Sequence, residues 1–582
     1  MAASSWRRLF LFAALLLTPQ NCVCASQKDT DGVPKYKFMQ EATSAPNISY
    51  YDYIVIGGGT AGCPLAATLS QNYSVLLLER GGSPYGNPNI TNLGAFGAAL
   101  SDTSPTSPSQ RFISEDGVIN SRARVLGGGS CLNAGFYTRA SPQYVREAGW
   151  DGRTVNESYE WVEKVVAFEP SLRQWQSAVR DGLLEVGVLP FNSFTYDHMN
   201  GTKIGGTIFD QNGHRHTAAD LLTQANPTKI TVFLHATVRR ILFRASRRPI
   251  ARAVVFGDAL GVKHKAYLKR GPSAEIIISA GALGSPQLLM LSGVGPAQHL
   301  GAHNISVVVD QPMVGQGMSD NPMNAVFIPS PVPVELSLIQ VVGITNSGTY
   351  IEAASGANFA GRTSTSSRDY GMFSPKVGQL SKLPPKQRTP EALAKAIQLM
   401  DSLDEAAFRG GFILEKIMGP TSRGHMELRT RNPNDNPSVT FNYFQDPRDL
   451  ERCVKGLSII ERVIESEAFS SFRYQNLSVP TLLNMTANSP VNLLPKHMNA
   501  SMSLEQYCRD TVMTIWHYHG GCQVGRVVDS DYKVLGVDAL RVIDGSTFNY
   551  SPGTNPQATV MMLGRYMGLK ILRQRLAVDE SK

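Results

Sequence analysis

A glycine-rich turn near residue 60 limits the possible folds more than any other feature of the sequence. Residues 51–56 are apolar and partly β-branched and predict a strand. The sequence Gly57-Gly58-Gly59-Thr60-Ala61-Gly62 follows at once, before a helical stretch that reaches about residue 70. In this order Gly57 permits a tight turn, Gly59 lets the backbone approach a pyrophosphate, and Gly62 lets the helix pack closely on the strand.

The next segment completes the pattern of a dinucleotide-binding unit. Residues 74–78 predict a second strand that ends at Glu79, which lies 22 residues after Gly57. A carboxylate at this place can accept hydrogen bonds from the ribose hydroxyls of an adenosine. The sequence therefore predicts an α/β domain with a bound dinucleotide, but these residues do not distinguish NAD from FAD. Because the chain has 582 residues, we expect at least one further domain.

The first 25 residues have the layout of a secretory signal. Arg7 and Arg8 precede an apolar run over residues 9–17, and we expect cleavage after Ala25. The alternative is a short anchor that is retained. The run is too short to span a bilayer, so we expect no stable membrane insertion. Residues 26–48 are polar and weakly patterned and predict a mobile arm.

The remaining composition narrows the function classes. After removal of the signal five cysteines are left, an odd set without metal-ligand spacing, so we expect no metal site. Ten Asn-x-Ser/Thr sequons fit a secreted, extracellular glycoprotein. The net charge of +8 comes without a dense basic tract that is interleaved with aromatics, which argues against nucleic-acid binding. A basic surface would still suit acidic polymers or anionic substrates.

Further motifs resemble one enzyme family at ordered intervals. Residues 123–133, with a second glycine-rich loop, are similar to the first signature of glucose–methanol–choline (GMC) oxidoreductases, and residues 279–295 are similar to the second. Shorter matches occur at residues 314–322, 422–424 and 436–437. The resemblance runs from about Tyr51 to Leu572 and covers nearly the whole chain after the signal.

This resemblance implies an α/β, Rossmann-like FAD-binding domain that is discontinuous in sequence, with an inserted α+β substrate domain built on an antiparallel sheet. We expect residues 49–140, 205–312 and 510–575 to form the FAD domain, and residues 141–204 and 313–509 to form the substrate domain and connections. The motifs and the resemblance indicate the following cofactor-binding residues: Gly57, Gly59, Thr60, Ala61, Gly62, Glu79, Arg80, Val125, Gly129, Asn133, Ala134, Gly135, Val238, Trp516, Asp544, Gly545, Pro556 and Gln557.

Two positions near the C-terminus are the candidate catalytic residues. The segment Trp516-His517-Tyr518-His519 places histidines among aromatic residues, where a poorly hydrated imidazole stays neutral and can take a proton. The family's His-x-x-Gly pattern assigns the base to His517 rather than His519. Asn555 falls where the family has a second His or an Asn, and its amide can donate a hydrogen bond to a substrate oxygen.

Within the family the sequence resembles two plant groups. Resemblance to HOTHEAD-like proteins implies oxidation of long-chain ω-hydroxy fatty acids in cuticle formation. Resemblance to mandelonitrile lyases implies cleavage of a hydroxynitrile, but those lyases typically carry His at the position of Asn555. A non-catalytic, FAD-stabilised binding or adhesion factor is the third alternative. The electron acceptor is left open, and we expect a monomer or weak oligomer.

Two further expectations depend on the resemblance. The arrangement of cysteines in mandelonitrile lyases implies a disulfide between Cys453 and Cys508, while Cys63 and Cys131 stay free in the cofactor loops. Some relatives bind the flavin covalently through a His just before the first signature. Residues 112–136 contain no His, so we expect FAD to be held without a covalent bond.

Overall fold

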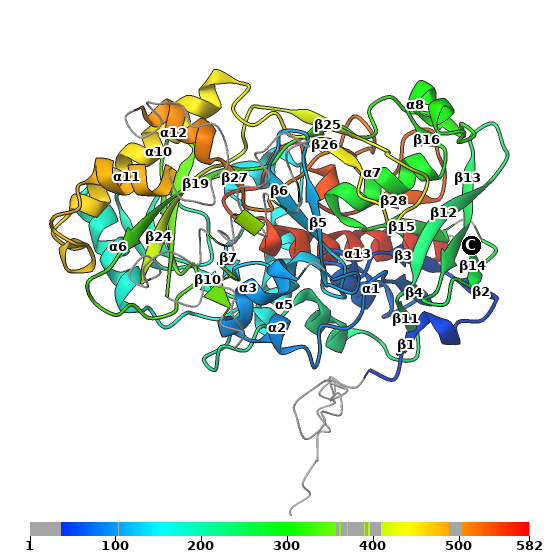
Figure 1. The fold of residues 1–582 in the computed structure, drawn as a ribbon. Coiled ribbons are helices and arrows are strands. Elements are labelled where there is room, and N and C mark those ends of the chain that lie inside the picture. Colours follow the sequence, from blue (N-terminus) through cyan, green and yellow to red (C-terminus); the bar gives the residue numbers. More distant parts are fainter. Residues whose placement is uncertain are drawn as a thin grey trace, which may run out of the picture.

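The chain forms a parallel-sheet domain and an antiparallel-sheet domain that lie side by side (Figure 1). The structure is a computed structural model, and it describes residues 36–102, 104–271, 273–356, 409–487 and 503–580, with a few isolated residues between 360 and 398. The predicted signal and the first part of the predicted arm lie outside these residues. No helix among the described residues is both long and apolar enough to cross a bilayer.

The first domain is built on a six-stranded sheet in which every neighbouring pair is parallel. Its strands, in spatial order, are β1 (Met39–Glu41), β11 (Ile230–Leu234), β4 (Val75–Leu78), β3 (Tyr53–Ile56), β15 (Glu275–Ile278) and β28 (Leu540–Val542). The central strands are apolar along their whole length because both faces of the sheet are covered. Helices α1 (Gly62–Leu69), α5 (Gly152–Val166) and α13 (Gln557–Glu580) contribute to one core.

The opposite face of this sheet packs on a second, four-stranded sheet and on helix α7 (Gly281–Leu291). The four strands are β12 (Thr237–Arg244), β13 (Ile250–Gly257), β14 (Lys263–Leu268) and β2 (Ile48–Tyr51). Alternation along β3 divides its residues between the two cores, with Tyr53 and Val55 on the helical side and Ile54 and Ile56 on the other. The domain therefore has three layers.

The second domain is built on a seven-stranded sheet that is antiparallel except for one parallel pair at its edge. In spatial order the strands are β27 (Met513–Thr514), β19 (Pro322–Pro329), β24 (Gly410–Ile417), β21 (Thr349–Ser355), β20 (Val341–Ile344), β9 (Gly201–Ile204) and β8 (Phe191–Phe194). One face is covered by α6 (Gln174–Glu185), α10 (Pro447–Glu465), α11 (Val479–Ala487) and α12 (Leu504–Thr511). The other face is turned toward the first domain (Figure 1).

The remaining elements are short sheets and short helices. The short sheets are formed by β5 (Ser109–Ile113) with β6 (Ile119–Ala123), β7 (Phe136–Tyr137) with β10 (Gly206–Thr207), β16 (Val294–Gly295) with β17 (Val309–Asp310), β22 (Ala360–Gly361) with β23 (Asp369–Tyr370), and β18 (Gln316–Met318) with β25 (Gly424–Glu427) and β26 (Ser438–Thr440). The remaining helices are α2 (Pro88–Thr91), α3 (Phe96–Ser101), α4 (Pro142–Glu147) and α8 (Ala297–Ala302), and the 3-10 helices include η1 (Ala42–Ser44), η3 (Gly128–Cys131), η4 (Ala218–Gln224) and η10 (Gly545–Thr547).

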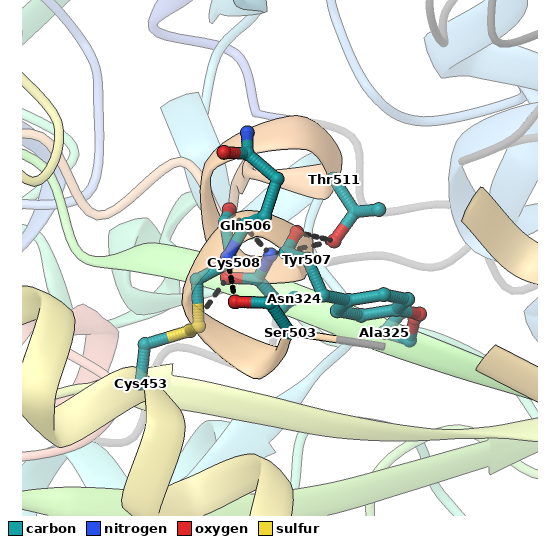
Figure 2. Close-up of a disulfide and its surroundings, with 8 residues drawn as sticks. All are labelled: Asn324, Ala325, Cys453, Ser503, Gln506, Tyr507, Cys508 and Thr511. Atoms are coloured by element: carbon teal, nitrogen blue, oxygen red, sulfur yellow. Dashed lines mark hydrogen bonds between the residues drawn. A yellow bond between two sulfur atoms is a disulfide. The ribbon is translucent and has the colours of Figure 1, made fainter. Parts of the chain in front are cut away.

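A disulfide joins Cys453 of α10 to Cys508 of α12, as predicted, with a Cα–Cα distance of 6.3 Å (Figure 2). The pair is completely buried against β19, where the Asn324 amide donates to the Cys508 carbonyl at 2.9 Å and to Thr511 Oγ1 at 2.7 Å. The other three cysteines in the described residues are buried free thiols, at positions 63, 131 and 522. The bond therefore fixes α12 on the helical layer of the second domain.

The structure differs from the predicted domain segments in three places. Residues 39–41, predicted as part of a mobile arm, form β1 and extend the parallel sheet beside β11. Helix α5 buries Tyr159 and Val162 against α13 in the first domain, although the sequence predicts residues 141–204 to form part of the substrate domain and connections. In the other direction, β27 adds residues 513–514 to the antiparallel sheet. Each difference follows from tertiary contacts, because short polar strands and amphipathic helices do not encode which sheet they cover.

Candidate active site

A deep cavity runs between the two domains and collects residues from many separate segments. Its volume of about 320 Å³ lies at the lower end of the roughly 300–1,000 Å³ of a site for a drug-sized ligand. Its walls come from the turn after β3, the end of β4, the loop before η3, the start of α7, the segment after β27 and the start of α13. The cavity is therefore an extended site that both domains line.

The glycine turn at residues 57–62 forms one end of this cavity. Gly57 has a φ of +101°, and a Cβ there would lie 2.4 Å from the Ser279 carbonyl oxygen. A Cβ on Gly62 would lie 1.9 Å from the Gly57 carbonyl oxygen, so Gly62 permits the close contact of helix and strand that the sequence predicts. Gly62 itself does not line the cavity, whereas Gly57, Gly59, Thr60 and Ala61 do.

Glu79 holds the turn in place from the end of β4. Its two carboxylate oxygens accept hydrogen bonds from the Gly58 amide at 2.9 Å and the Gly81 amide at 2.7 Å. Burial raises its pKa above the ordinary value. Each carboxylate oxygen keeps a second lone pair, and Glu79 lines the cavity. Glu79 can therefore accept a hydrogen bond from a ribose hydroxyl.

The loop near residues 125–135 and the start of α13 are bound to each other by side-chain amides. Asn133 Nδ2 donates to Gln557 Oε1 at 2.8 Å, and Gln557 Nε2 donates to the Phe136 carbonyl at 2.6 Å. Asp544 accepts from the Gly281 amide at 2.9 Å and from the Ser546 amide at 2.8 Å, which ties α7 to η10. These contacts bring the predicted flavin-contacting residues into one wall.

His517 lines the cavity at the junction of the two domains, and His519 does not. Trp516, which precedes His517, has a φ of +60°. This left-handed conformation costs free energy in a residue of this size, and it changes the chain direction so that His517 lies at the cavity. His519 instead uses Nδ1 to donate to the His517 carbonyl at 2.9 Å and pairs through its backbone with Ser319. The geometry distinguishes the two histidines as the sequence motif does.

His517 is surrounded by a polar wall behind the cavity. Its Nδ1 lies 3.2 Å from Asn321 Nδ2 and 3.3 Å from the hydroxyl oxygen of Tyr350, and that hydroxyl donates to the Thr554 carbonyl at 3.1 Å. Burial, the charge of Lys416 and the neighbouring His519 lower the pKa of His517 well below its ordinary 6.5. The ring is therefore neutral at physiological pH and able to accept a proton.

Asn555 lines the same part of the cavity, next to a buried ion pair of the antiparallel sheet. Glu352 of β21 and Lys416 of β24 are completely buried and in contact with each other. The Asn555 side chain interacts with the Glu352 carboxylate, while Asn555 Oδ1 is buried with no hydrogen-bond partner among the described residues. Burial raises the pKa of Glu352 and lowers that of Lys416. The Asn555 NH2 group has two N–H donors, so one can donate to a ligand while the other binds Glu352.

Comparison with known proteins identifies the family. Two models described as GMC oxidoreductase match residues 51–323 and 420–564. The chain belongs to the GMC oxidoreductase family. It is an FAD-dependent oxidoreductase that acts on CH–OH groups, and the fold class predicted from the resemblance is confirmed.

Several curated relatives of this GMC oxidoreductase are plant proteins. Protein HOTHEAD of Arabidopsis thaliana is 52% identical over 98% of each chain. An (R)-mandelonitrile lyase-like protein of the same species is 48% identical over 93% of each chain. Sinalpyl alcohol oxidase Nec3 of Nesocodon mauritianus is 41% identical over 98% of each chain.

Solved structures share the fold at much lower identity. A formate oxidase has a TM-score of 0.71 at 18% identity, with 91% of this chain and 99% of that chain covered. A pyridoxine 4-oxidase from Mesorbium loti has a TM-score of 0.69 at 21% identity, with 89% and 98% covered. These likenesses concern the fold alone.

The residues of the cavity fit FAD, the cofactor of the GMC oxidoreductases. Gly59, Gly129, Gly281 and Gly545 all line the cavity, and a Cβ on any of them would meet no protein atom closer than 3.8 Å. Their bare backbones leave open space in front of the two glycine loops, where an extended dinucleotide can lie against backbone amides. Side chains would fill this space.

The predicted cofactor residues other than Gly62 all line the cavity, although their individual roles stay proposals. They are Gly57, Gly59, Thr60, Ala61, Glu79, Arg80, Val125, Gly129, Asn133, Ala134, Gly135, Val238, Trp516, Asp544, Gly545, Pro556 and Gln557. Tyr350, Glu352 and Lys416 were not predicted from the sequence. They lie on strands of the antiparallel sheet, up to 167 residues from His517, and no local motif marks them.

Proposed function

We propose that the enzyme oxidises an alcohol, with His517 as the general base and Asn555 as the group that binds the substrate oxygen. The observation that carries this proposal is that a half-buried, neutral His517 and Asn555 line one cavity together with both glycine loops. FAD, when bound, supplies a two-electron acceptor for the hydride of the carbinol carbon. His517 removes the hydroxyl proton, and the Asn555 amide donates a hydrogen bond to the oxygen as negative charge develops.

Tyr350 acts in this proposal as a positioning residue that selects the tautomer of His517. A base at Nε2 requires the ring proton on Nδ1. The Tyr350 hydroxyl has one proton, and its contact with the Thr554 carbonyl at 3.1 Å is shorter than its contact with His517 at 3.3 Å. Donation to Thr554 leaves the Tyr350 oxygen free to accept from His517 Nδ1–H.

Asn321 defines the competing arrangement. Its Nδ2 lies 3.2 Å from His517 Nδ1, and donation there would put the ring proton on Nε2 and block the base. The same Nδ2 also reaches Ser551 Oγ and the Thr554 carbonyl, each at 3.4 Å, and can direct both of its protons to them. The proposal therefore predicts a specific proton position that can be measured.

For the substrate we propose a long apolar alcohol, of which ω-hydroxy fatty acids are the members implied by resemblance to HOTHEAD. The cavity wall near His517 is apolar and is formed by Phe96, Leu100, Leu338, Ile339, Ala354, Leu414, Ile515 and Trp516. The described wall residues from the antiparallel sheet include no Lys or Arg, so the reacting end of the substrate lies in apolar surroundings. Sinalpyl alcohol oxidase Nec3 is named for an alcohol as well.

Absorbance spectroscopy under anaerobic conditions tests the proposed function. Bleaching of the flavin bands by a long ω-hydroxy acid, and not by a short polyol, is the expected result. Release of aldehyde and cyanide from mandelonitrile without bleaching would assign a lyase instead. No response to any alcohol or hydroxynitrile would favour the non-catalytic binding factor. Secretion through residues 1–25 and a role in the cuticle stay predictions.

A further inference from the structure

One segment carries as much positive charge as the net charge of the whole protein. Residues 237–270 contain ten Lys and Arg and one acid, Asp258, so their net charge of +9 exceeds the +8 of the whole chain. The segment forms strands β12, β13 and β14. The rest of the molecule is nearly neutral, and the charge is therefore a local feature of this small sheet and not a general property of the surface.

Three of the basic side chains, Arg240, Lys263 and Lys265, share the outer face of the sheet with apolar ones. Along β14, exposed Lys263 and Lys265 alternate with buried His264 and Ala266. The register places Arg240 and Lys265 on either side of Val255, in one row that ends at Ile48 of β2. No charged partner among the described residues forms an ion pair with Arg240, Lys263 or Lys265, so these charges face solvent.

The acids near this face already have partners. Asp258 accepts from the Leu260 and Val262 amides, each at 2.9 Å, and lies 3.3 Å from the His264 ring. Asp52 pairs with Lys269 and Asp538 pairs with Arg248 at the far end of the sheet. The excess of positive charge therefore acts on what lies outside the protein.

Exposed apolar side chains gather at the same place. Leu260 at the tip of the turn between β13 and β14 is 79% exposed, and Val262 beside it is 47% exposed. On β2, Ile48 is 54% exposed and Tyr50 is 58% exposed, and Tyr50 stacks on Tyr267 with ring centroids 5.7 Å apart. Large apolar groups at this exposure mark an interaction surface when they are contiguous and bordered by charge.

We propose that the outer face of β12, β13, β14 and β2, with the turn at residues 258–262, docks on an anionic lipid bilayer. Basic side chains attract anionic headgroups, and aliphatic tips and Tyr rings enter the boundary between headgroups and acyl chains. An acidic polysaccharide would use the charges but not the exposed Leu260 and Val262. The docking face lies at the opposite end of the molecule from α10–α12, so the antiparallel domain stays clear of the bilayer (Figure 1).

Flotation of the intact FAD-loaded protein with vesicles tests this docking face. We expect binding to phosphatidylcholine vesicles that contain phosphatidylserine, little binding to pure phosphatidylcholine, and loss of binding as salt rises. Joint replacement Lys263→Gln and Lys265→Gln should weaken binding about 25-fold, since each basic residue near the surface contributes about fivefold. Joint replacement Leu260→Ser and Val262→Ser should weaken it at least about fivefold without changing the salt dependence.

Matched control variants distinguish the effect of this face from a general effect of net charge or surface hydrophobicity. Arg146→Gln with Lys164→Gln removes two exposed charges from α4 and α5, and Leu189→Ser removes an exposed apolar side chain elsewhere. Both controls should bind like the wild type, and all variants should keep the flavin spectrum and melting temperature. Wild-type binding by the Lys263/Lys265 variant, or equal binding to both kinds of vesicle, would overturn the proposal.

Two further experiments extend the test. One distinguishes lipid from acidic polysaccharide as the ligand of the face, and the other asks whether the face is accessible in the glycosylated protein. Retention on immobilised polygalacturonate that depends on Lys263 and Lys265, without vesicle binding, would assign the face to acidic polysaccharide and overturn the lipid proposal. Asn47, next to Ile48, begins a sequon, and a glycan there would cover the face. We expect the wild type and Asn47→Gln to bind the vesicles equally. Vesicle binding by Asn47→Gln but not by the wild type would show that a glycan covers the face, and would refute docking by the secreted protein.

Discussion

Replacing Tyr350 by Phe removes the hydroxyl that we propose to fix the proton of His517 on Nδ1. The ring of Tyr350 is completely buried and packs in the antiparallel domain, so the phenyl group is retained and one oxygen is lost. Loss of a buried hydrogen-bond partner costs about 1–3 kcal/mol. If the loss destabilises the His517 tautomer with an unprotonated Nε2 by this free energy, the limiting rate of flavin reduction should fall about 5- to 150-fold. Stopped-flow absorbance under anaerobic conditions measures this rate.

A second measurement does not depend on catalysis. Nitrogen-15 NMR of labelled histidines, with the His517 signals assigned from His517→Asn, reports which ring nitrogen carries the proton. We expect Nδ1–H in the wild type and a shift toward Nε2–H in Tyr350→Phe. Tyr507→Phe is the matched control, because that buried hydroxyl donates to the Ala325 carbonyl at 2.8 Å, away from His517. Nε2–H in the wild type, or equal rates in Tyr350→Phe and the wild type, would refute the positioning role.

Other expected outcomes follow from the same geometry. His517→Ala should keep FAD and lose about 100- to 10,000-fold in the rate of flavin reduction. Asn555→Ala should lose less, and His519→Ala should lose least. An equal loss of rate in His519→Ala and His517→Ala would contradict the assignment of the base. Because a base acts in its neutral form and the pKa of His517 is lowered, the limiting rate should stay constant as the pH falls through 6.5, and an apparent pKa at or above 6.5 would argue against His517 as the base. Cys453→Ala with Cys508→Ala should lower the free energy of unfolding by about 4 kcal/mol, because the disulfide closes a loop of 55 residues, and denaturant titration checks the value. Acid precipitation should release all of the flavin into the supernatant, and yellow colour in the pellet would show a covalent bond.

Local sequence was enough to predict the cofactor half of the site. Gly57 and Gly62 are required by backbone contacts within a single strand–turn–helix unit, so their spacing alone carries the information. Apolar runs at residues 53–56 and 75–78 indicate strands covered on both faces, and they form the centre of the parallel sheet. The same holds for His517, which an aromatic segment and a short motif distinguish from His519.

Other parts of the site depended on contacts between distant segments. Tyr350 reaches His517 across 167 positions, and Glu352 reaches Lys416 across 64, because neighbouring strands β21 and β24 and the segment after β27 converge beside the cavity. Residues 39–41 joined the parallel sheet although their own sequence is polar, since an edge strand is stabilised by main-chain hydrogen bonds to β11.

The sequence by itself thus determined the family, the cofactor loops and the histidine that we propose as the base. Only the tertiary structure decided which side chains surround that histidine and which proton arrangement they favour. It also decided that Arg240 and Lys265 lie in one row with exposed Ile48. The physical reason is the sequence separation over which each interaction acts. Turn geometry and strand burial act between neighbours in the chain, whereas hydrogen bonding, desolvation and surface charge depend on atoms that only folding brings together.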